Sequence, residues 1–470
     1  MTAPACVSRP GVMVVRNPWS GAVLAELPAA GAPQVEAALE RARAGAVAAA
    51  GLSRAARGDI LDRTAASLEA DAEGAACLIT QEAGKPIAQA RKEVRRAVNT
   101  LRLSAAEARR LCGETLPFDS FAGAEGVTGF FEREPLGVIL GVTPFNDPLN
   151  LVCHKAGPAI AGGNALILKP SELAPLSAMA LASRLEAAGL PPGVFTVING
   201  GPEAVRHLAG DPCVRMISFT GGTAAAEAIV RAGGVKRYAM DLGGVAPVLV
   251  MADADLDAAV ASCVSGAFWA AGQNCVGVQR ILVERPIAEA FTSAFAAAAG
   301  ALRLGDPMDE TVDVGPMINA DHASRVETLI GEATGLGARL LTGGARRGAL
   351  LAPAVLADTP AQARLSVEEA FGPVVSIVAA DDLDEALALA NSTEISLHAA
   401  IFTGSLDQAL AATRRLQASS VMVNMSSDFR HDAMPFGGFK AGGLGREGVR
   451  FALEEMTQTK VTAFAPLTRR

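Results

Sequence analysis

The chain has 470 residues, of which 50% are hydrophobic and 19% charged, with a formal net charge of −8 at pH 7. This length predicts roughly two to four domains with well-filled cores, and the composition excludes a disordered or fibrous protein. The acidic balance leaves no basic stripe that would neutralise a phosphate backbone, so we expect no nucleic-acid partner.

The sequence also argues against membrane and metal binding. It lacks an uninterrupted apolar run of about 18 residues, the length of a membrane-spanning helix, and its first residues lack the pattern of a secretory signal. We therefore expect a cytoplasmic protein with no membrane partner. The seven cysteines form no C-x-x-C pair, and the five histidines form no H-x-x-x-H pair with a nearby carboxylate. These spacings predict neither a disulfide framework nor a metal site.

Short β-branched runs alternate with helical stretches from about residue 136, as in a parallel sheet covered by helices. Strands are expected at 136–142, 164–170, 193–200 and 213–222, and helices at 149–163, 177–190, 201–210 and 223–234. This alternation predicts a doubly wound α/β domain.

A second alternating series begins near residue 246 and continues past residue 400. Its first elements are expected as a strand at 246–251, a helix at 255–271, a strand at 279–284 and a helix at 286–302. Residues 117–134 have the pattern of a hairpin, and residues 456–464 that of one further exposed strand. Unpaired edge strands usually find a partner, which suggests a subunit interface.

Two strand ends carry candidate ligand-binding residues. Gly221 and Gly222 end one strand just before a helix, where backbone amides and the helix dipole can face a pyrophosphate. An ordinary tight turn explains the same glycines, because no G-x-G-x-x-G is present. Lys169 and Glu172 follow a neighbouring strand, at the edge where open α/β sheets bind ligands. A carboxylate there would accept from ribose hydroxyls and repel a 2′-phosphate, which favours NAD over NADP, although a solvated loop pair is the alternative.

Cys275, in "AAGQNCVGVQR", is a candidate nucleophile. It lies between a predicted helix and a predicted strand, and Gly272 permits a sharp turn before it. That position suits an exposed, reactive thiol, yet lone cysteines are more often buried packing residues. The local sequence names no oxyanion donor or proton acceptor for it.

Seven motifs distinguish these possibilities, because together they resemble the aldehyde dehydrogenase superfamily in order and approximate spacing. They are "PFN" at 144–146, "KPSE" at 169–172, "FTGG" at 219–222, "DLGG" at 241–244, "GQNCVGVQR" at 272–280, "EEAFGP" at 368–373 and "PFGGFKAGGLGREG" at 435–448. The resemblance spans nearly the whole chain and argues against a non-catalytic binding protein. It implies an α/β fold with two doubly wound domains plus a small β oligomerisation element, and a homodimer or homotetramer. The implied boundaries are 1–114 with 135–243 for the NAD-binding domain, 244–445 for the catalytic domain, and 115–134 with 456–470 for the oligomerisation strands.

The same resemblance implies roles for three catalytic residues. Cys275 would attack the aldehyde to give a thiohemiacetal, and Asn146 would hold the oxyanion together with the backbone N–H of Cys275. Asp241 would activate the water that hydrolyses the thioester. The family usually has Glu at this position, and Asp retracts the carboxylate by about 1.5 Å, which would slow deacylation or require a relay water. Because members that acylate coenzyme A commonly lack the Glu, coenzyme A transfer is the alternative.

The cofactor implied by the resemblance is NAD, with NADP less favoured. Lys169 and Glu172 would bind the adenosine ribose, and Glu369 the nicotinamide ribose. Phe371 would pack near the nicotinamide. The remaining cofactor-binding residues, which would face the pyrophosphate, are Thr220, Gly221 and Gly222.

The substrate implied by the resemblance is a small polar or anionic aldehyde. The C-terminal run is most similar to the branch of phosphonoacetaldehyde, lactaldehyde and non-phosphorylating glyceraldehyde-3-phosphate dehydrogenases. By that similarity Arg430, His154 and Arg102 would face an anionic group, favouring phosphonoacetaldehyde or phosphonoformaldehyde. Arg102 is equally explained as a solvent-facing arginine, and His154 as a core histidine. Asn274, in the substrate site, stands where those relatives often carry Arg, so lactaldehyde, glyceraldehyde-3-phosphate and semialdehydes are alternatives.

Overall fold

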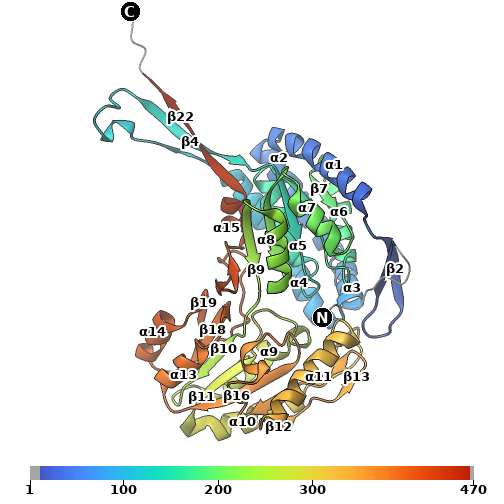
Figure 1. Ribbon diagram of the computed structural model, residues 1–470, viewed down its shortest axis with the longest axis vertical. Coiled ribbons are helices and arrows are strands. Elements are labelled where there is room, and N and C mark those ends of the chain that lie inside the picture. Colours follow the sequence, from blue (N-terminus) through green and yellow to red (C-terminus); the bar gives the residue numbers. More distant parts are fainter. Residues whose placement is uncertain (1–10, 466–470) are drawn as a thin grey trace, which may run out of the picture.

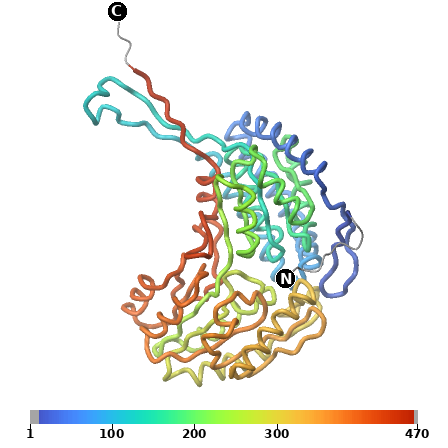
Figure 2. The backbone as a smooth tube through the Cα atoms, in the orientation of Figure 1, coloured from blue at the N-terminus to red at the C-terminus, as the bar shows by residue number. Residues whose placement is uncertain are grey.

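The computed structural model describes residues 11–465. It consists of two α/β bodies and a β arm that projects from the first of them (Figure 1). The chain builds the first body, continues into the second, and returns to the first before it ends in the arm (Figure 2). The start of the predicted NAD-binding segment and the end of the predicted strand at 456–470 lie outside the described residues.

The first body opens with a small antiparallel pair and four helices. These elements are β1 (Val12–Arg16), β2 (Val23–Pro28), α1 (Ala32–Gly51), α2 (Arg54–Ala70), α3 (Ala72–Ala83) and α4 (Ile87–Arg110). The buried positions of α4 include Val94, Ala97, Val98 and Leu101, the three- and four-residue spacing of an amphipathic helix. Its opposite side is free to carry the charged residues that reach the site described below.

The sheet of the first body has the strand order β21-β9-β8-β5-β6-β7, and only β21 is antiparallel to its neighbour. Its strands are β5 (Val138–Val142), β6 (Ala165–Lys169), β7 (Phe195–Val197), β8 (Val214–Thr220), β9 (Arg237–Asp241) and β21 (Gly443–Leu444). The chain runs outward from β5 to β7 and then crosses back to β8. The strand order therefore reverses between β5 and β8, the point where such sheets bind ligands.

Helices cover both faces of this sheet. The core on one face is formed with α2, α3, α4, α5 (Asn150–Ala161) and α6 (Leu176–Ala187). The core on the other face is formed with α1, α7 (Pro202–Gly210) and α8 (Thr223–Gly233). The predicted doubly wound domain is thus present.

The second body contains a seven-stranded sheet in the order β12-β15-β16-β11-β10-β18-β19, in which β12 alone is antiparallel. Its strands are β10 (Pro247–Val250), β11 (Arg280–Glu284), β12 (Arg339–Thr342), β15 (Ala354–Ala357), β16 (Val374–Ala380), β18 (His398–Phe402) and β19 (Ser420–Val423). One face is covered by α9 (Leu256–Phe268), α10 (Arg285–Gly300) and α11 (Ala320–Gly335), and the other by α13 (Leu383–Ala390) and α14 (Leu406–Arg415). Shorter elements are η2 (Trp269–Gly272), β13 (Arg346–Arg347), β14 (Leu350–Leu351), α12 (Arg364–Val367), β17 (Ile395–Ser396) and β20 (Phe439–Lys440).

The chain returns to the first body through β21 and α15 (Val449–Glu455). Residues 443–444 were expected in the catalytic domain, but here they pair with β9 of the first sheet. Glycine permits this approach, since a Cβ on Gly443 would overlap the carbonyl oxygen of Met240. The return brings the C-terminal motif against the carboxyl end of β9, where Asp241 lies.

The arm is a three-stranded antiparallel sheet in the order β22-β4-β3. It comprises β3 (Glu114–Thr115), β4 (Thr128–Pro135) and β22 (Thr457–Phe464), with η1 (Phe118–Ser120) between the first two. The predicted hairpin is short, because β3 contributes only two residues, whereas β22 pairs with β4 along its whole length. The base of the arm contacts the first body beside α15, and the rest of the arm extends away from both bodies (Figure 1).

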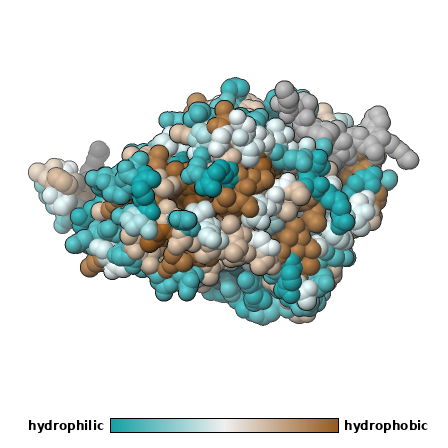
Figure 3. Space-filling model, turned by 90° about the horizontal axis from the view of Figure 1, so that it is seen from below, coloured by the Kyte–Doolittle hydropathy of each residue, from teal (hydrophilic) through white to brown (hydrophobic). Residues whose placement is uncertain are grey.

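The surface is mixed in character. On the face shown in Figure 3, apolar residues are interspersed with polar ones. Within residues 11–465, no helix is both long and apolar enough to cross a bilayer.

Candidate active site

A cavity of about 180 Å³ contains Cys275 and is lined by Leu151 of α5 and by four further segments. Helix α4 contributes Lys92 and Arg96, and the loop after β5 contributes Asn146 and Asp147. The loop before β11 contributes residues 269, 270 and 273–276, and the loop after β19 contributes residues 428 and 430. Since one water occupies about 30 Å³ in the liquid, the cavity accommodates a small molecule.

The loop that carries Cys275 has an unusual backbone. Helix α9 ends at Phe268, three residues before its predicted end, because Ala270 and Ala271 adopt φ angles of 50° and 55°. Left-handed alanines cost roughly 1–3 kcal/mol each and persist only where the surroundings hold them. Here the N–H of Ala270 donates to Gln89 Oε1 (2.8 Å), and Gln273 Nε2 donates to the Ala270 carbonyl (3.0 Å). These bonds fix the position of the sulfur.

Cys275 is half-buried and packs against the cluster of Val276, Leu397 and Phe436. Burial raises the pKa of the Cys275 thiol, and the nearby Arg430 opposes that rise. The thiol is therefore protonated at neutral pH and needs a base before it can attack a carbonyl. Asn274 lines the same cavity, as predicted, and its Oδ1 accepts from the N–H of Val276 (3.3 Å).

Asn146 shares the cavity with Cys275, as the oxyanion prediction requires. Its Oδ1 is buried and has no hydrogen-bond partner among the described residues. The backbone N–H of Cys275 likewise has no acceptor within them. An oxyanion hole needs N–H donors, and the side-chain NH2 of Asn146 and the backbone N–H of Cys275 are two such donors in the wall of one cavity.

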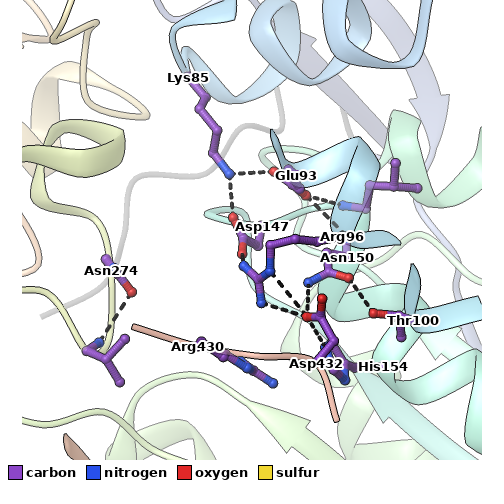
Figure 4. Close-up of polar contacts among 12 residues, drawn as sticks. Lys85, Glu93, Arg96, Thr100, Asp147, Asn150, His154, Asn274, Arg430 and Asp432 are labelled. Atoms are coloured by element: carbon purple, nitrogen blue, oxygen red, sulfur yellow. Dashed lines mark hydrogen bonds and ion pairs between the residues drawn. The ribbon is translucent and has the colours of Figure 1, made fainter. Parts of the chain in front are cut away.

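A buried ion-pair network fixes the segment next to Asn146 (Figure 4). The Asp147 carboxylate accepts from Lys85 and from Arg96 (3.3 Å), and Lys85 also pairs with Glu93. Arg96 extends the network to Asp432, at 2.9 Å. Because breaking a buried pair costs about 3–5 kcal/mol, this network holds the loop after β5 rigidly against α4 and the C-terminal motif.

Arg96, and not Arg102, is the α4 arginine that lines the cavity. Six residues at about 100° each place Arg102 some 120° around the helix from Arg96. The Arg102 guanidinium pairs with Glu69, and 47% of its side chain is exposed. It borders a separate hollow with Arg430 that does not include Cys275. Its predicted position at the substrate is therefore not what the structure shows.

His154 is also placed away from the cavity. Its side chain is fully buried, and its Nε2 lies 3.1 Å from Asp432 Oδ1. Burial and the nearby Arg430 lower the pKa of His154, so the ring is neutral at pH 7 and offers no positive charge to an anion. The structure favours the alternative of a packed histidine.

Arg430 lines the cavity and belongs to a second buried cluster. Its guanidinium donates to Glu447 Oε2 (3.0 Å) and lies 3.7 Å from the centre of the Phe436 ring. Glu447 Oε1 in turn accepts from Lys155 Nζ, at 2.8 Å. These contacts fix the orientation of Arg430 at the cavity wall. Glu447 forms an ion pair with one of its guanidinium nitrogens.

Asp241, the expected base, ends β9 and is 4% exposed. Burial and the neighbouring Glu447 raise the pKa of Asp241 well above the usual range, whereas Lys155 and Arg430 oppose the rise. Asp241 is close enough to raise the pKa of Cys275, although its side chain does not line the cavity. A carboxylate outside the cavity wall would need a relay water to act on a thioester at Cys275.

Some of the residues expected to bind a dinucleotide are available to a ligand, whereas others are already hydrogen-bonded within the protein. Lys169 Nζ lies 2.6 Å from Glu172 at the carboxyl end of β6. The N–H of Gly221 donates to the Asp241 carbonyl (3.0 Å), so it is not free for a pyrophosphate. Thr220 turns inward, and its hydroxyl accepts from Lys155 (2.9 Å). Gly222, at the N-terminus of α8, has open space beside it and leaves the first turn of that helix accessible to an anion.

Glu369 supports a nucleotide site independently. Its Oε1 is buried without a hydrogen-bond partner among the described residues, and burial raises the pKa of Glu369 to about 8. A Cβ on Gly243 would lie 2.7 Å from this carboxyl group, so the glycine admits it. Phe371 packs edge-on against Phe145, with ring centres 5.8 Å apart. A carboxyl oxygen without a partner suits a ribose hydroxyl, and the Phe145–Phe371 pair offers an aromatic surface suited to a nicotinamide ring.

The aldehyde dehydrogenase family model matches residues 7–462. The chain belongs to the aldehyde dehydrogenase family. The family predicted from the motifs is thereby confirmed, and with it an oxidoreductase of the aldehyde dehydrogenase type.

Individual aldehyde dehydrogenases resemble the chain over its full length. It is 55% identical over 447 residues to aspartate-semialdehyde dehydrogenase 1 of Pseudomonas canavaninivorans, covering 95% of each chain. It also matches the solved aldehyde dehydrogenase 21 of Physcomitrella patens in complex with the product succinate, at 36% identity and a TM-score of 0.94, covering 97% of this chain and 95% of that one.

A third relative lies in the predicted branch. The glyceraldehyde-3-phosphate dehydrogenase of Methanocaldococcus jannaschii, solved with NADP, has 38% identity and a TM-score of 0.94, covering 98% of this chain and all of that one. The fold class and the branch predicted from the sequence are confirmed. Because aldehyde dehydrogenases use NAD or NADP, the predicted preference for NAD needs a separate argument.

Several site residues were missed from the sequence. Lys92 and Arg96 are spaced four residues apart on α4, so they share a helix face, and this spacing is a readable signal. Glu447 stands inside the quoted C-terminal motif but was given no role. Lys155 lies on a helix whose twelve residues are all buried, where a charged residue needs a partner. Within residues 11–465, no group of three or more His, Cys, Asp or Glu side chains is arranged to hold a metal.

Proposed function

We propose that this aldehyde dehydrogenase oxidises a short aldehyde that carries a carboxylate, a semialdehyde, to the corresponding dicarboxylate. The observation that carries the proposal is the cavity itself, where Cys275 and Asn146 share the wall with Arg430 and Lys92. The two cations suit an anionic group on the aldehyde. The relatives named for aspartate semialdehyde and solved with succinate support four-carbon semialdehydes as substrates.

A phosphonate-bearing aldehyde, the substrate favoured by motif resemblance, fits this cavity less well. Asp147 and Asp428 line it as well, and Arg96 already pairs with two carboxylates. The carboxylates of the cavity would repel a phosphonate dianion more strongly than a singly charged carboxylate, because like charges at close range are costly. The neutral side chain of Asn274 adds no compensating cation.

In the proposed mechanism, the Cys275 thiol loses its proton to solvent water and the thiolate attacks the aldehyde carbon. The resulting oxyanion accepts hydrogen bonds from the Asn146 side-chain NH2 and the Cys275 N–H, and the thiohemiacetal becomes the thioester when its carbon gives up a hydride. NAD or NADP, when bound, supplies the hydride acceptor. The remaining thioester is hydrolysed by a water that loses its proton to Asp241. Because burial and the neighbouring Glu447 raise the pKa of Asp241, the ionised carboxylate is a stronger base than an ordinary aspartate.

The experiment that tests the function is a panel of aldehydes assayed for reduced-cofactor formation without coenzyme A. We expect succinic semialdehyde or aspartate 4-semialdehyde to give a higher kcat/KM than phosphonoacetaldehyde, lactaldehyde or glyceraldehyde-3-phosphate. A highest kcat/KM with phosphonoacetaldehyde would overturn the substrate proposal. Turnover that requires coenzyme A would establish the acylating alternative instead.

We further propose NAD as the preferred cofactor, because Glu172 stands at the carboxyl end of β6. Replacing Glu172 with glutamine should lower kcat/KM for NAD about tenfold and improve turnover with NADP, since a repulsive charge is removed. Initial rates with both cofactors measure the ratio, and the exposed Glu203→Gln is a matched control. The Methanocaldococcus relative was solved with NADP. A wild-type protein that turns over faster with NADP than with NAD would contradict the proposal.

The arm supports a homodimer or homotetramer. One edge of its sheet is β22, which has eight residues and no strand on its outer side in the described chain. Val461 and Phe464 on this strand are 57% and 56% exposed. An open edge with exposed apolar residues is a site for pairing with another subunit.

A further inference from the structure

Asp428 is a cavity-lining carboxylate for which the proposed chemistry has no use. It lies two residues before Arg430 in the loop after β19, and both line the cavity of Cys275. Its Oδ1 accepts from the Ser426 hydroxyl, whereas its Oδ2 has no hydrogen-bond partner among the described residues. The carboxylate also lies against α9, where a Cβ on Gly266 would lie 2.8 Å from Oδ1. The side chain is therefore fixed in position with one oxygen available.

Lys92 lines the same cavity with an available charge of the opposite sign. Its ammonium lies 4.9 Å from the centre of the Trp269 ring, which is another cavity wall. Among the described residues, no carboxylate oxygen lies within 4.0 Å of the Lys92 ammonium nitrogen, and this includes the carboxylate of Asp428. The other charged residues of the cavity, Arg96, Asp147 and Arg430, are each held in ion pairs. The cavity thus presents one carboxylate and one ammonium group that form no ion pair with each other, although Lys92 is near enough to oppose the rise that burial causes in the pKa of Asp428.

This charge arrangement fits a molecule that bears both signs. An anionic aldehyde alone would leave the Asp428 carboxylate unpaired beside it, and a partly desolvated charge without a partner is costly. An α-amino acid carries its ammonium and its carboxylate on one carbon, so the two groups diverge toward separate partners. Asp428 then accepts from the ammonium, while Lys92 and Arg430 donate to the carboxylate.

Building on the proposed function, we propose that Asp428 is the specificity-determining residue that binds the α-ammonium group of an amino-acid semialdehyde. The substrate class of the site is then zwitterionic four-carbon semialdehydes. The role of Asp428 is in substrate choice, because its carboxylate is not required for attack by Cys275 or for hydrolysis of the thioester.

Two substrates isolate this contact. Aspartate 4-semialdehyde and succinic semialdehyde share the four-carbon chain, the aldehyde and the carboxylate, and differ only in the α-ammonium group. In Asp428→Asn, which keeps the shape and the Ser426 contact, kcat/KM for aspartate 4-semialdehyde should fall about ten- to hundredfold. The fall for succinic semialdehyde should be much smaller, so the ratio of the two values changes. Lys92→Met is the matched control, because both substrates carry the carboxylate and both should weaken alike.

A second measurement needs no variant. L-Aspartate should inhibit the wild-type protein more strongly than succinate, which lacks the ammonium group. Equal inhibition by the two products, or an Asp428→Asn ratio equal to that of the wild type, would overturn the role of Asp428 while leaving the semialdehyde dehydrogenase activity intact. If the wild-type protein oxidises neither semialdehyde, the proposed function fails, and the inference fails with it.

Discussion

Replacing Cys275 with serine should abolish aldehyde-dependent formation of reduced cofactor, lowering kcat by at least about a thousandfold. A serine hydroxyl has nearly the volume of the thiol, so the cavity and the left-handed loop before it remain. The hydroxyl is a far weaker nucleophile than a thiolate. Among the residues that the structure describes, no histidine lines the cavity that could act as a base and activate it. The absorbance of the reduced cofactor measures the loss directly.

The control for this variant is Cys112→Ser. Cys112 is an exposed free thiol that lines a surface hollow remote from Cys275, so its replacement should leave kcat and KM unchanged. The assignment of Cys275 is wrong if the Cys275→Ser protein, folded by circular dichroism, still turns over at a rate near that of the wild type.

Replacing Asp241 with asparagine should separate the two halves of the reaction. The first half uses the Cys275 thiolate, formed by proton loss to solvent, and Asn146, whereas hydrolysis of the thioester uses Asp241 as the base that activates water. We therefore expect a rapid burst of reduced cofactor, at most one per site, followed by steady turnover about 10²–10⁴-fold slower than in the wild type. Stopped-flow absorbance resolves the burst from the steady phase, and the exposed Asp257→Asn is the matched control. Loss of the burst together with the steady rate would assign Asp241 to the first half instead.

The same residue sets a pH dependence with a defined sign. The base form of Asp241 is the ionised form, and burial with Glu447 raises its pKa well above the usual range. The deacylation rate should therefore rise with pH at values where an ordinary aspartate is already ionised. In Glu447→Gln the charge that raises the pKa of Asp241 is gone, while Lys155 and Arg430 remain, so the rising limb should move to lower pH.

The sequence predicted those parts of the fold and site that depend on local patterns. The two doubly wound bodies follow from alternating strands and helices. Cys275, Asn146 and Arg430 were placed through their motifs, and the structure brings all three to one cavity. Motifs succeed here because each lies in a loop connected to a strand of one of the two sheets, and the sheet topology brings these loops together.

Features that depend on contacts between distant segments were not predictable in the same way. The role of Arg96 comes from Asp147 and Asp432, which lie 51 and 336 residues away in the chain. Arg102 is chemically identical and only six residues distant, but it faces Glu69. The inward turn of Thr220 depends on Lys155, and Asp428 gains significance only because Lys92, on α4, reaches the same cavity. The spacing of residues along the sequence does not indicate contacts between segments that are far apart in the chain.

The proposed reaction depends on a thioester that forms on Cys275 and is hydrolysed through Asp241. Mass spectrometry of Asp241→Asn, quenched with acid after mixing with a four-carbon semialdehyde and the oxidised cofactor, detects this intermediate. We expect an added mass of one acyl group on the peptide that contains Cys275, absent from the wild-type protein at the end of turnover. Accumulation of reduced cofactor without any acyl mass on that peptide would contradict the proposed reaction.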